Sequence, residues 1–307
     1  MKRFKFAARE FCFPCWGCFP CWGSLAIEMA GEAGFSGLQL ADAGGYLQPH
    51  PGNNGYVEYE RYGLDLRRKD SFPLTLREVQ EDYLESASAS GVELVSIYLY
   101  TLEHQGFIKY SRNTPQGAQC MESIQSAVLA ASQMGIPIVT IPAKGMFGVA
   151  QNEYALSMLQ YAIETAEDHG VQIAACVDPQ VRRRLLNTFK GKLKLEIDTL
   201  SPMVQGVGCP EEVTSGLDAD CVSCFRMEDA YPDDEGFFTP ETSEAALLGQ
   251  GKAGFSRQAQ AIVDSGYTGW ILSGTPYYHP HIQSRGEDYV SLAAKDVLAL
   301  SQAFHQS

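Results

Sequence analysis

The chain has 307 residues, of which 45% are hydrophobic and 20% are charged, and this composition excludes an intrinsically disordered or low-complexity protein. Its formal net charge of −14 disfavours nucleic-acid binding, because an acidic surface repels phosphate groups. The dense basic runs, Arg67–Lys69 and Arg182–Arg184, are short and lack interleaved aromatic residues, so both are interpreted as solvated faces.

The sequence favours a cytoplasmic protein that does not enter a membrane. No apolar run approaches the ~18 residues that cross a bilayer. The basic segment Met1–Lys5 is soon followed by Arg9 and Glu10, which interrupt any signal-peptide core. Nine cysteines, an odd number, fit a reducing compartment better than a disulfide framework.

Short β-rich runs alternate with amphipathic helices along the chain. The expected strands are 3–8, 35–41, 92–102, 136–141, 171–177, 192–198, 220–227 and 269–273. The expected helices are 24–33, 74–90, 115–134, 152–169, 180–189, 255–265 and 286–304. Thr75 is the expected N-cap of the second helix, and glycines such as Gly91 and Gly135 end the helices. This alternation predicts a parallel sheet that closes into a (β/α)8 TIM barrel, and the absence of a linker predicts one domain over 1–307.

Two long connections follow strands on the side where barrel active sites form. Residues 43–72, which include His50, far exceed the usual length of such loops and are interpreted as a lid or pocket wall. Residues 228–253 leave the seventh strand on the same side.

Four segments carry a further signal through their order and spacing: Ala30–Leu40, Ala162–Ala175, Leu195–Thr199 and Gly249–Ile271. Together they resemble the xylose isomerase-like TIM barrels, in the group called sugar phosphate isomerases/epimerases. The resemblance covers nearly the whole chain and implies the barrel fold. It also implies a divalent cation, held by a Glu ending strand five, an Asp on strand six, a His on strand seven and a Glu ending strand eight, the two Glu carboxylates acting as acid and base.

The residues at those positions depart from the pattern. They are Cys176, Asp198, Arg226 and Gly274, so one of the four ligands is kept. A single carboxylate cannot fix a hard cation, and Arg226 places a permanent positive charge where the ion would lie. The guanidinium can replace the cation by pairing with Asp198 or binding a carboxylate or phosphate. The alternative is a buried ion pair in a site that has lost its chemistry.

Other polar residues follow the same strand ends. Asp178 is either a displaced carboxylate that binds substrate or a helix N-cap before Pro179. Glu103 and His104 close the third strand as candidates for a general base or a hydroxyl ligand. Lys144 ends the fourth strand and either binds an anionic group or faces solvent.

Tyr277 and the pattern His279-Pro280-His281 follow the eighth strand. The aromatic residues of this loop are expected to stack on the apolar face of a sugar-like ligand. His279 and His281, together with Asp198 or Asp178, form a weaker alternative for a borderline metal.

Cys12, Cys15, Cys18 and Cys21 recur every three residues within a duplicated hexapeptide. The spacing is compatible with an iron–sulfur cluster or zinc, but duplication alone produces it. Trp16 lies in this segment as a candidate pocket residue.

The leading hypothesis is an isomerase or epimerase that transfers a proton next to the carbonyl of a sugar or cyclitol. Such an enzyme would act without the usual metal, with Asp198 or Glu103 as base and Arg226, Lys144 or His104 stabilising the enediolate oxygen. The alternative is a catalytically inactive barrel that binds carbohydrate or supports a partner. The substrate's identity and a homo-oligomeric state stay open.

Overall fold

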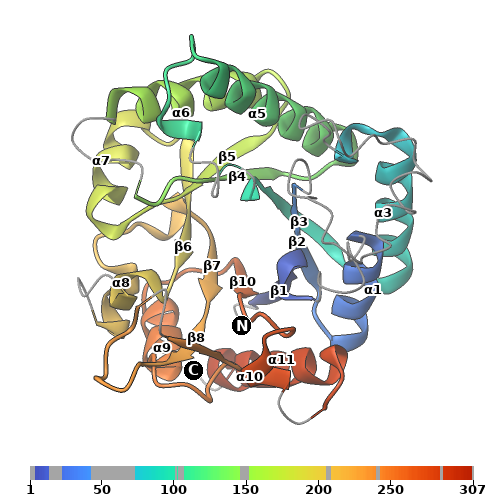
Figure 1. Cartoon of the computed structure of the whole chain (residues 1–307), viewed down its shortest axis with the longest axis vertical. Coiled ribbons are helices and arrows are strands. Elements are labelled where there is room, and N and C mark those ends of the chain that lie inside the picture. The colour runs from blue at the N-terminus through green and yellow to red at the C-terminus, as the bar shows by residue number, and fades with distance from the viewer. Residues whose placement is uncertain are drawn as a thin grey trace.

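The computed structural model describes residues 4–13, 23–42, 73–100, 102, 107–145, 152–204, 209–239, 243–283 and 286–305. In this part of the chain, eight parallel strands close into a barrel in the order β1-β10-β7-β6-β5-β4-β3-β2. The helices surround the strands (Figure 1). The architecture is a TIM barrel, as the alternation of strands and helices predicts.

The barrel strands lie close to the expected positions. They are β1 (Lys5–Arg9), β2 (Gly37–Ala41), β3 (Glu93–Tyr98), β4 (Ile138–Pro142), β5 (Gln172–Cys176), β6 (Leu193–Asp198), β7 (Val222–Met227) and β10 (Trp270–Ser273). A two-stranded antiparallel hairpin, β8 (Asp229–Tyr231) and β9 (Glu244–Ala246), was not expected and lies within the long connection after β7.

The larger helices are α1 (Gly23–Ala33), α3 (Arg77–Ser90), α5 (Pro115–Met134), α6 (Asn152–Glu167), α7 (Pro179–Phe189), α9 (Phe255–Asp264) and α11 (Tyr289–His305). Short helices are α8 (Ser201–Val204) and α10 (Pro280–Gln283), with 3-10 turns η1 (Glu10–Cys12), η2 (Pro73–Thr75), η3 (Phe107–Lys109), η4 (Pro210–Thr214) and η5 (Ala219–Cys221).

The glycines predicted to end helices do so, whereas the predicted N-cap of α3 is wrong. Gly91 and Gly135 end α3 and α5 in the left-handed conformation, at φ 66° and 71°. Thr75 is not the N-cap of α3. It ends the turn η2, and Leu76 occupies the N-cap position without a side-chain capping bond.

The barrel interior changes from apolar to polar along the strands. Near the strand starts, Ala7, Val95, Cys224 and Leu272 pack together with Trp270. Further along, the buried polar residues are Gln39, Ser96, Thr140, Glu196, Asp198 and Arg226. Barrel interiors are usually filled by branched apolar side chains, so this polar layer marks the carboxyl ends of the strands as the place to look for a site.

The connection after β7 folds around one buried carboxylate. Asp229 accepts hydrogen bonds from the backbone N–H groups of Ala230, Gly249, Gly251 and Ala253, at 2.9–3.0 Å. A Cβ atom at Gly251 would lie 2.3 Å from Asp229 Oδ1, so this position requires glycine. The glycines between 249 and 254 therefore hold a carboxylate of the chain itself.

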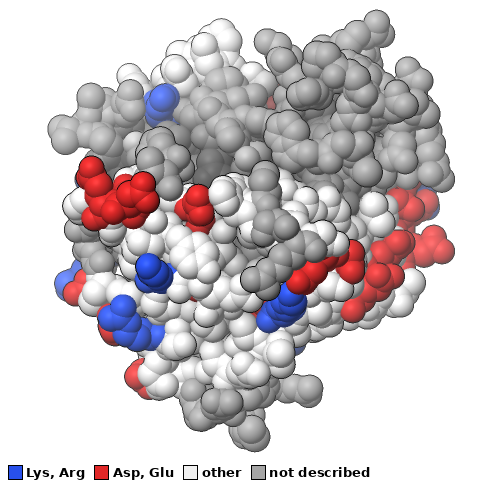
Figure 2. Space-filling model, turned by 60° about the horizontal axis from the view of Figure 1, so that its bottom comes forward, with Lys and Arg blue, Asp and Glu red and all other residues white. Residues whose placement is uncertain are grey.

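On the face shown in Figure 2, described basic side chains form small patches beside larger groups of acidic ones, in keeping with the negative net charge. Among the described residues, no helix is both long enough and apolar enough to span a membrane.

Glu10, directly after β1, gives a prediction about stability. Its buried carboxyl accepts a 2.8 Å hydrogen bond from Ala41 N, and burial raises its pKa to about 7. Because the pKa is higher in the folded than in the unfolded chain, stability is lost as the pH rises from about 4.5 to about 7. Glu10→Gln, which stays neutral and keeps an acceptor, should therefore exceed the wild type in unfolding free energy by about 3 kcal/mol above pH 7.5.

Urea unfolding between pH 5 and 8.5 measures this difference, which should shrink towards zero at the acidic end. Glu28→Gln, at an exposed position of α1, is the control. If the difference in unfolding free energy between Glu10→Gln and the wild type does not change with pH, the raised pKa of Glu10 is contradicted.

Candidate functional site

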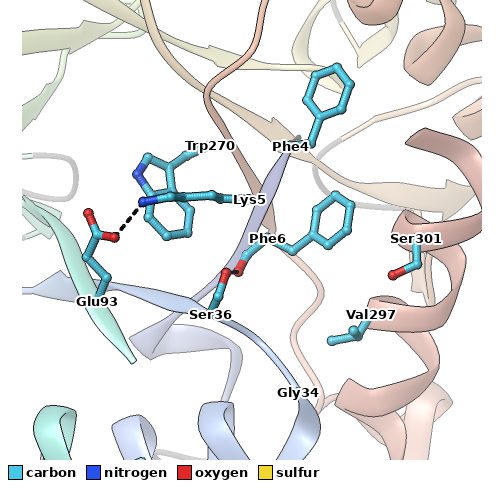
Figure 3. A pocket seen from close by; sticks show the side chains of 9 residues that line it. All are labelled: Phe4, Lys5, Phe6, Gly34, Ser36, Glu93, Trp270, Val297 and Ser301. Carbon is cyan, nitrogen blue, oxygen red and sulfur yellow. Dashed lines mark hydrogen bonds and ion pairs between the residues drawn. The ribbon is translucent and has the colours of Figure 1, made fainter. Parts of the chain in front are cut away.

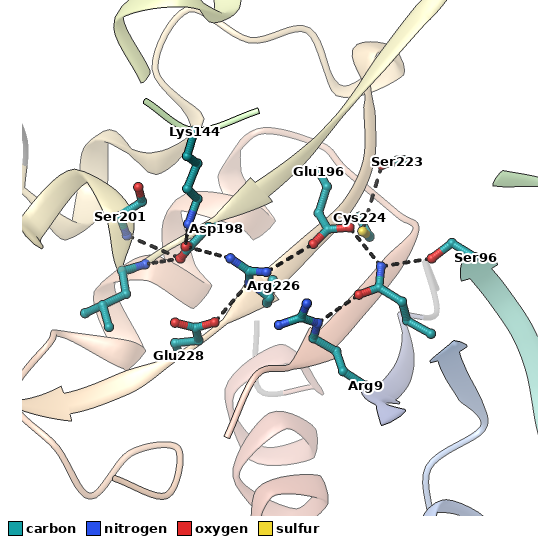
Figure 4. Close-up of polar contacts among 12 residues, drawn as sticks. Arg9, Ser96, Lys144, Glu196, Asp198, Ser201, Ser223, Cys224, Arg226 and Glu228 are labelled. Atoms are coloured by element: carbon teal, nitrogen blue, oxygen red, sulfur yellow. Dashed lines mark hydrogen bonds and ion pairs between the residues drawn. The ribbon is translucent and has the colours of Figure 1, made fainter. Parts of the chain in front are cut away.

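Six charged side chains meet at the carboxyl end of the barrel and are called the mouth cluster here (Figure 4). They are Arg9, Lys144, Glu196, Asp198, Arg226 and Glu228. The strand register explains the meeting, since Asp198 and Arg226 are paired neighbours on β6 and β7, and Lys144 follows β4. With all groups ionised, three cations face three carboxylates.

Asp198 is the anchor of the cluster. Its Oδ2 accepts hydrogen bonds from Lys144 Nζ and from Arg226 Nη2, the latter at 2.7 Å. Its Oδ1 accepts from the backbone N–H groups of Leu200 and Ser201, at 2.9 and 3.2 Å. Burial alone would raise the pKa of Asp198, but Lys144 and Arg226 hold it well below its usual range. A carboxylate so stabilised in its ionised form is a poor proton acceptor, which argues against Asp198 as the base.

Arg226 is buried and lies between three carboxylates. Besides Asp198, its Nη1 lies 3.5 Å from Glu196 Oε1, and its Nε lies 3.0 Å from Glu228 Oε1. The side chain points into the barrel mouth (Figure 4). Its charge lies beside Asp198, the residue of the implied ligand set that this sequence keeps.

A series of hydrogen bonds across the barrel interior holds Glu196, one of the carboxylates beside Arg226. Gln39 Nε2 donates to Glu196 Oε2 at 2.8 Å and to Ser96 Oγ at 2.9 Å, while Gln39 Oε1 accepts from Arg9 Nε at 2.8 Å. The Arg9 guanidinium also lies over the Tyr98 ring, 4.6 Å from its centroid. This series fixes the orientation of Glu196 and Arg9 across four strands.

Glu228 is the cluster carboxylate that reaches solvent, with 24% of its side chain exposed. Burial and the neighbouring Asp198 raise its pKa, against the opposing effect of Arg226. A Cβ atom at Gly274 would lie 2.5 Å from Glu228 Cγ and 2.7 Å from Oε1. The space that a side chain after β10 would fill is thus occupied by a carboxylate from β7.

Sequence reasoning missed Arg9, Glu196 and Glu228. The available signal was alternation: Glu196 precedes Asp198 by two residues and Glu228 follows Arg226 by two, so each pair shares a face of its strand. Glu103, His104, Trp16 and His50 lie outside the described residues, as do Cys15, Cys18 and Cys21.

Asp178 and Cys12 have roles in the surrounding structure. Asp178 occupies the N-cap position of α7, but its side chain makes no capping bond; its Oδ2 accepts from Gly145 N at 2.6 Å. The Cys12 thiol is buried, donates to Ser273 O at 3.2 Å, and has its pKa raised to about 12 by burial. Such a thiol is a poor metal ligand, because binding requires the thiolate.

The residues after β10 do not join the mouth cluster. Tyr277 is fully buried, and its hydroxyl lies 3.1 Å from both Asp296 Oδ2 and Ser273 Oγ, so its ring offers no face to a sugar. The rings of His279 and His281 stack at 5.3 Å, and His281 lies 3.5 Å from Glu244 rather than beside Asp198 or Asp178.

The donors at the mouth do not fit the metal that the resemblance implied. Both oxygens of Asp198 are used by cations and backbone amides, Arg226 stands in place of a histidine, and burial raises the pKa of the Cys176 thiol to about 11. Within the described residues, no group of three or more His, Cys, Asp or Glu side chains is arranged to hold a metal ion.

A pocket of about 470 Å³ lies at the opposite end of the barrel (Figure 3). Phe4, Phe6 and Trp270 line it, together with the half-exposed ion pair Lys5–Glu93 at 2.7 Å. Because it lies at the amino ends of the strands, where TIM barrels carry stability rather than chemistry, it is not the candidate active site.

No protein-family model and no curated protein matches this sequence. Solved structures match it over almost its whole length. The IolI protein with a bound zinc atom has a TM-score of 0.69 at 13% identity, covering 99% of each chain. D-allulose 3-epimerase from Methylomonas sp. has a TM-score of 0.65 at 15% identity, again covering 99% of each chain.

The 3-keto-D-glucoside 4-epimerase from E. coli has a TM-score of 0.62 at 11% identity, covering 98% of this chain and 100% of that one. A xylose isomerase domain protein from Planctomyces limnophilus reaches 0.65 at 15%, covering 100% and 99%. At these identities the likeness shows the fold, a xylose isomerase-like TIM barrel, and confirms the resemblance at that level.

The contact between Gly274 and Glu228 gives a second prediction. Gly274→Ala should displace the Glu228 side chain and lower the unfolding free energy by about 1–3 kcal/mol. In a Glu228→Ala background most of this cost should disappear, because the atoms that the new Cβ meets are gone. Denaturant unfolding of the wild type, both single variants and the double variant measures the coupling; equal costs in both backgrounds would contradict the contact.

Proposed function

We propose that this chain, which has the xylose isomerase-like barrel fold, is a proton-transfer enzyme acting next to the carbonyl of a sugar or cyclitol, in the isomerase or epimerase class. The observation that carries the proposal is Glu228, a partly exposed carboxylate with a raised pKa at the barrel mouth, 3.0 Å from the Arg226 guanidinium. A raised pKa brings a carboxylate closer to the working pH of a general base. Glu228 replaces the earlier candidate base Asp198.

In this proposal Glu228 removes the proton from the carbon next to the carbonyl, the electron pair of that C–H bond forms the C=C bond of the enediolate, and the π pair of the carbonyl moves to its oxygen. The negative charge thereby passes from Glu228 to the enediolate oxygen. Arg226 stays charged throughout, and it compensates the negative charge first on Glu228 and then on the enediolate oxygen. Returning a proton to the same carbon from the opposite face completes epimerisation. Returning it to the former carbonyl carbon, while the hydroxyl proton passes from one enediolate oxygen to the other, completes isomerisation.

The remaining cations assist at the mouth. Lys144 and Arg226 converge on one oxygen of Asp198, which holds both in place. Arg9 Nη2 is buried and makes no hydrogen bond within the described part of the chain, so it has a donor available for an oxyanion. Glu103 and His104, outside the described residues, remain proposed contributors to the same site.

The structural neighbours support the substrate class. Two of them are named as epimerases of D-allulose and of a 3-keto-D-glucoside, and the D-allulose 3-epimerase also matches as a complex with D-allulose. Zinc belongs to the IolI structure, and no step proposed for this chain passes through a metal.

One observation favours the second candidate, a catalytically inactive carbohydrate-binding barrel. Asp198, the one ligand of the implied metal set that is kept, is fully occupied by internal bonds. Carbohydrate binding without proton exchange would support this candidate.

The experiment is exchange of substrate C–H protons in deuterated water, followed by NMR over a panel of ketoses, aldoses and keto-cyclitols. The wild type should exchange a proton next to the carbonyl of at least one compound. Glu228→Gln should lower that rate at least about 100-fold, because the amide cannot accept the proton. The wild-type rate should fall as the pH drops through a value above the usual carboxyl range.

Glu235→Gln is the matched control, since Glu235 is an exposed carboxylate of the same connection. It should leave exchange unchanged. Undiminished exchange in Glu228→Gln, with the fold intact by circular dichroism, would remove Glu228 as the base. No exchange by the wild type across the panel would remove the enzyme proposal.

A further inference from the structure

Arg182 departs from the expectation that the basic run 182–184 is a solvated face. Arg183 and Arg184 are exposed, but Arg182, in the first turn of α7, is only 5% exposed. One cation of the run is thus turned into the protein, at the end of the barrel where β5 leads into α7. Burying a charge is costly unless a partner compensates it, so the surroundings of Arg182 require an explanation.

Within the described residues, no carboxylate forms a direct ion pair with Arg182. Nη1 donates to the carbonyl oxygen of Val213 at 3.3 Å, and this acceptor is neutral. Nε and Nη2 are buried and make no hydrogen bond in the part of the chain that the structure describes. The carboxylates that act on Arg182 through space are Asp198, held by Lys144 and Arg226, and Asp178, bonded to Gly145 N. Burial accordingly lowers the pKa of Arg182.

The two unpaired nitrogens define the shape of the missing partner. Nε–H and Nη2–H lie on the same edge of a guanidinium and point in parallel, which matches two oxygens of one carboxylate or phosphate. The amino end of α7 adds a favourable potential for an anion, and its N-cap residue Asp178 makes no side-chain capping bond there. Water would satisfy the donors but leave the charge uncompensated.

We propose that the Nε–Nη2 edge of Arg182 is a subsite for an oxyanion group of a ligand bound at the barrel mouth. Arg182 lies in the first turn of α7, whose N-cap residue Asp178 accepts from the backbone N–H of Gly145, the residue next to Lys144, so the subsite lies beside the mouth cluster. The ligand class is therefore a polyhydroxylated carbonyl compound that also carries a carboxylate or a phosphate. Shielding from solvent strengthens such a pair, and entry requires a local opening at the first turn of α7.

This inference rests on the proposed function for the carbonyl part of the ligand, whereas oxyanion binding is measured without turnover. The probes are inorganic phosphate and D-glycerate, with glycerol as the neutral control and chloride holding ionic strength constant. Thermal unfolding and calorimetric titration of the full chain should show that phosphate, D-glycerate or both raise Tm, and that glycerol does not. The anion that binds more tightly identifies the source of the oxyanion.

Arg182→Met should lower the affinity for that anion at least about tenfold. Arg182→Lys, which keeps the charge but lacks the two parallel N–H donors, should also lower the affinity. Arg183→Met, an exposed neighbour on α7, should bind as the wild type does. Without anion, Arg182→Met should match or exceed the wild type in Tm, because an uncompensated buried charge has been removed.

Three results would overturn the subsite. They are a wild-type Tm that neither anion raises, an Arg182→Met variant that still binds the anion as tightly as the wild type, and an equal loss of binding in Arg183→Met. Anion binding together with absent proton exchange would sustain the subsite and refute the proposed function, so the two failures are distinguishable.

Discussion

The mouth of this barrel depends on the neutralisation of one buried guanidinium. Arg226 lies inside a ring of three carboxylates, and this pairing makes its burial tolerable. Glu196 and Asp198 are buried with it, whereas Glu228 is partly exposed to solvent. The polar layer of the barrel follows from this requirement, since Gln39 and Ser96 complete the hydrogen bonding of Glu196.

Gly274 belongs to the same arrangement. β7 and β10 are neighbours in register, and the backbone N–H of Gly274 donates to Met227 O at 2.8 Å. A side chain at 274 would occupy the volume of the Glu228 carboxylate. Gly274 and Glu228 are therefore coupled sterically: a side chain directly after β10 and the carboxylate two residues beyond Arg226 cannot occupy the same volume.

How much of this could be predicted from sequence depended on the range of the interactions. The barrel was predictable because strand and helix periodicities are local. Asp198 ends β6 and Arg226 is the last residue but one of β7, so the strand boundaries alone bring both to the barrel mouth. Glu228 was missed because the space for its side chain is left by a glycine 46 positions later, after the neighbouring strand β10. Arg182 was misassigned because composition cannot show which of three consecutive arginines turns inward. Tyr277 was predicted to stack on a sugar because sequence does not show that its ring is buried and its hydroxyl lies against Asp296.

A fixed guanidinium and a divalent cation impose different chemistry on the same fold. A metal ion accepts lone pairs from a substrate and carries two charges, whereas Arg226 donates hydrogen bonds and carries one. In the proposed reaction, a barrel that stabilises an enediolate with monovalent cations therefore needs several of them, and Arg9, Lys144 and Arg226 all converge on this mouth. Their carboxylate partners keep the resting site neutral, so the cluster gains a free positive charge only when Glu228 takes up a proton. In the proposed reaction, proton uptake by Glu228 and stabilisation of the enediolate anion are thus one event.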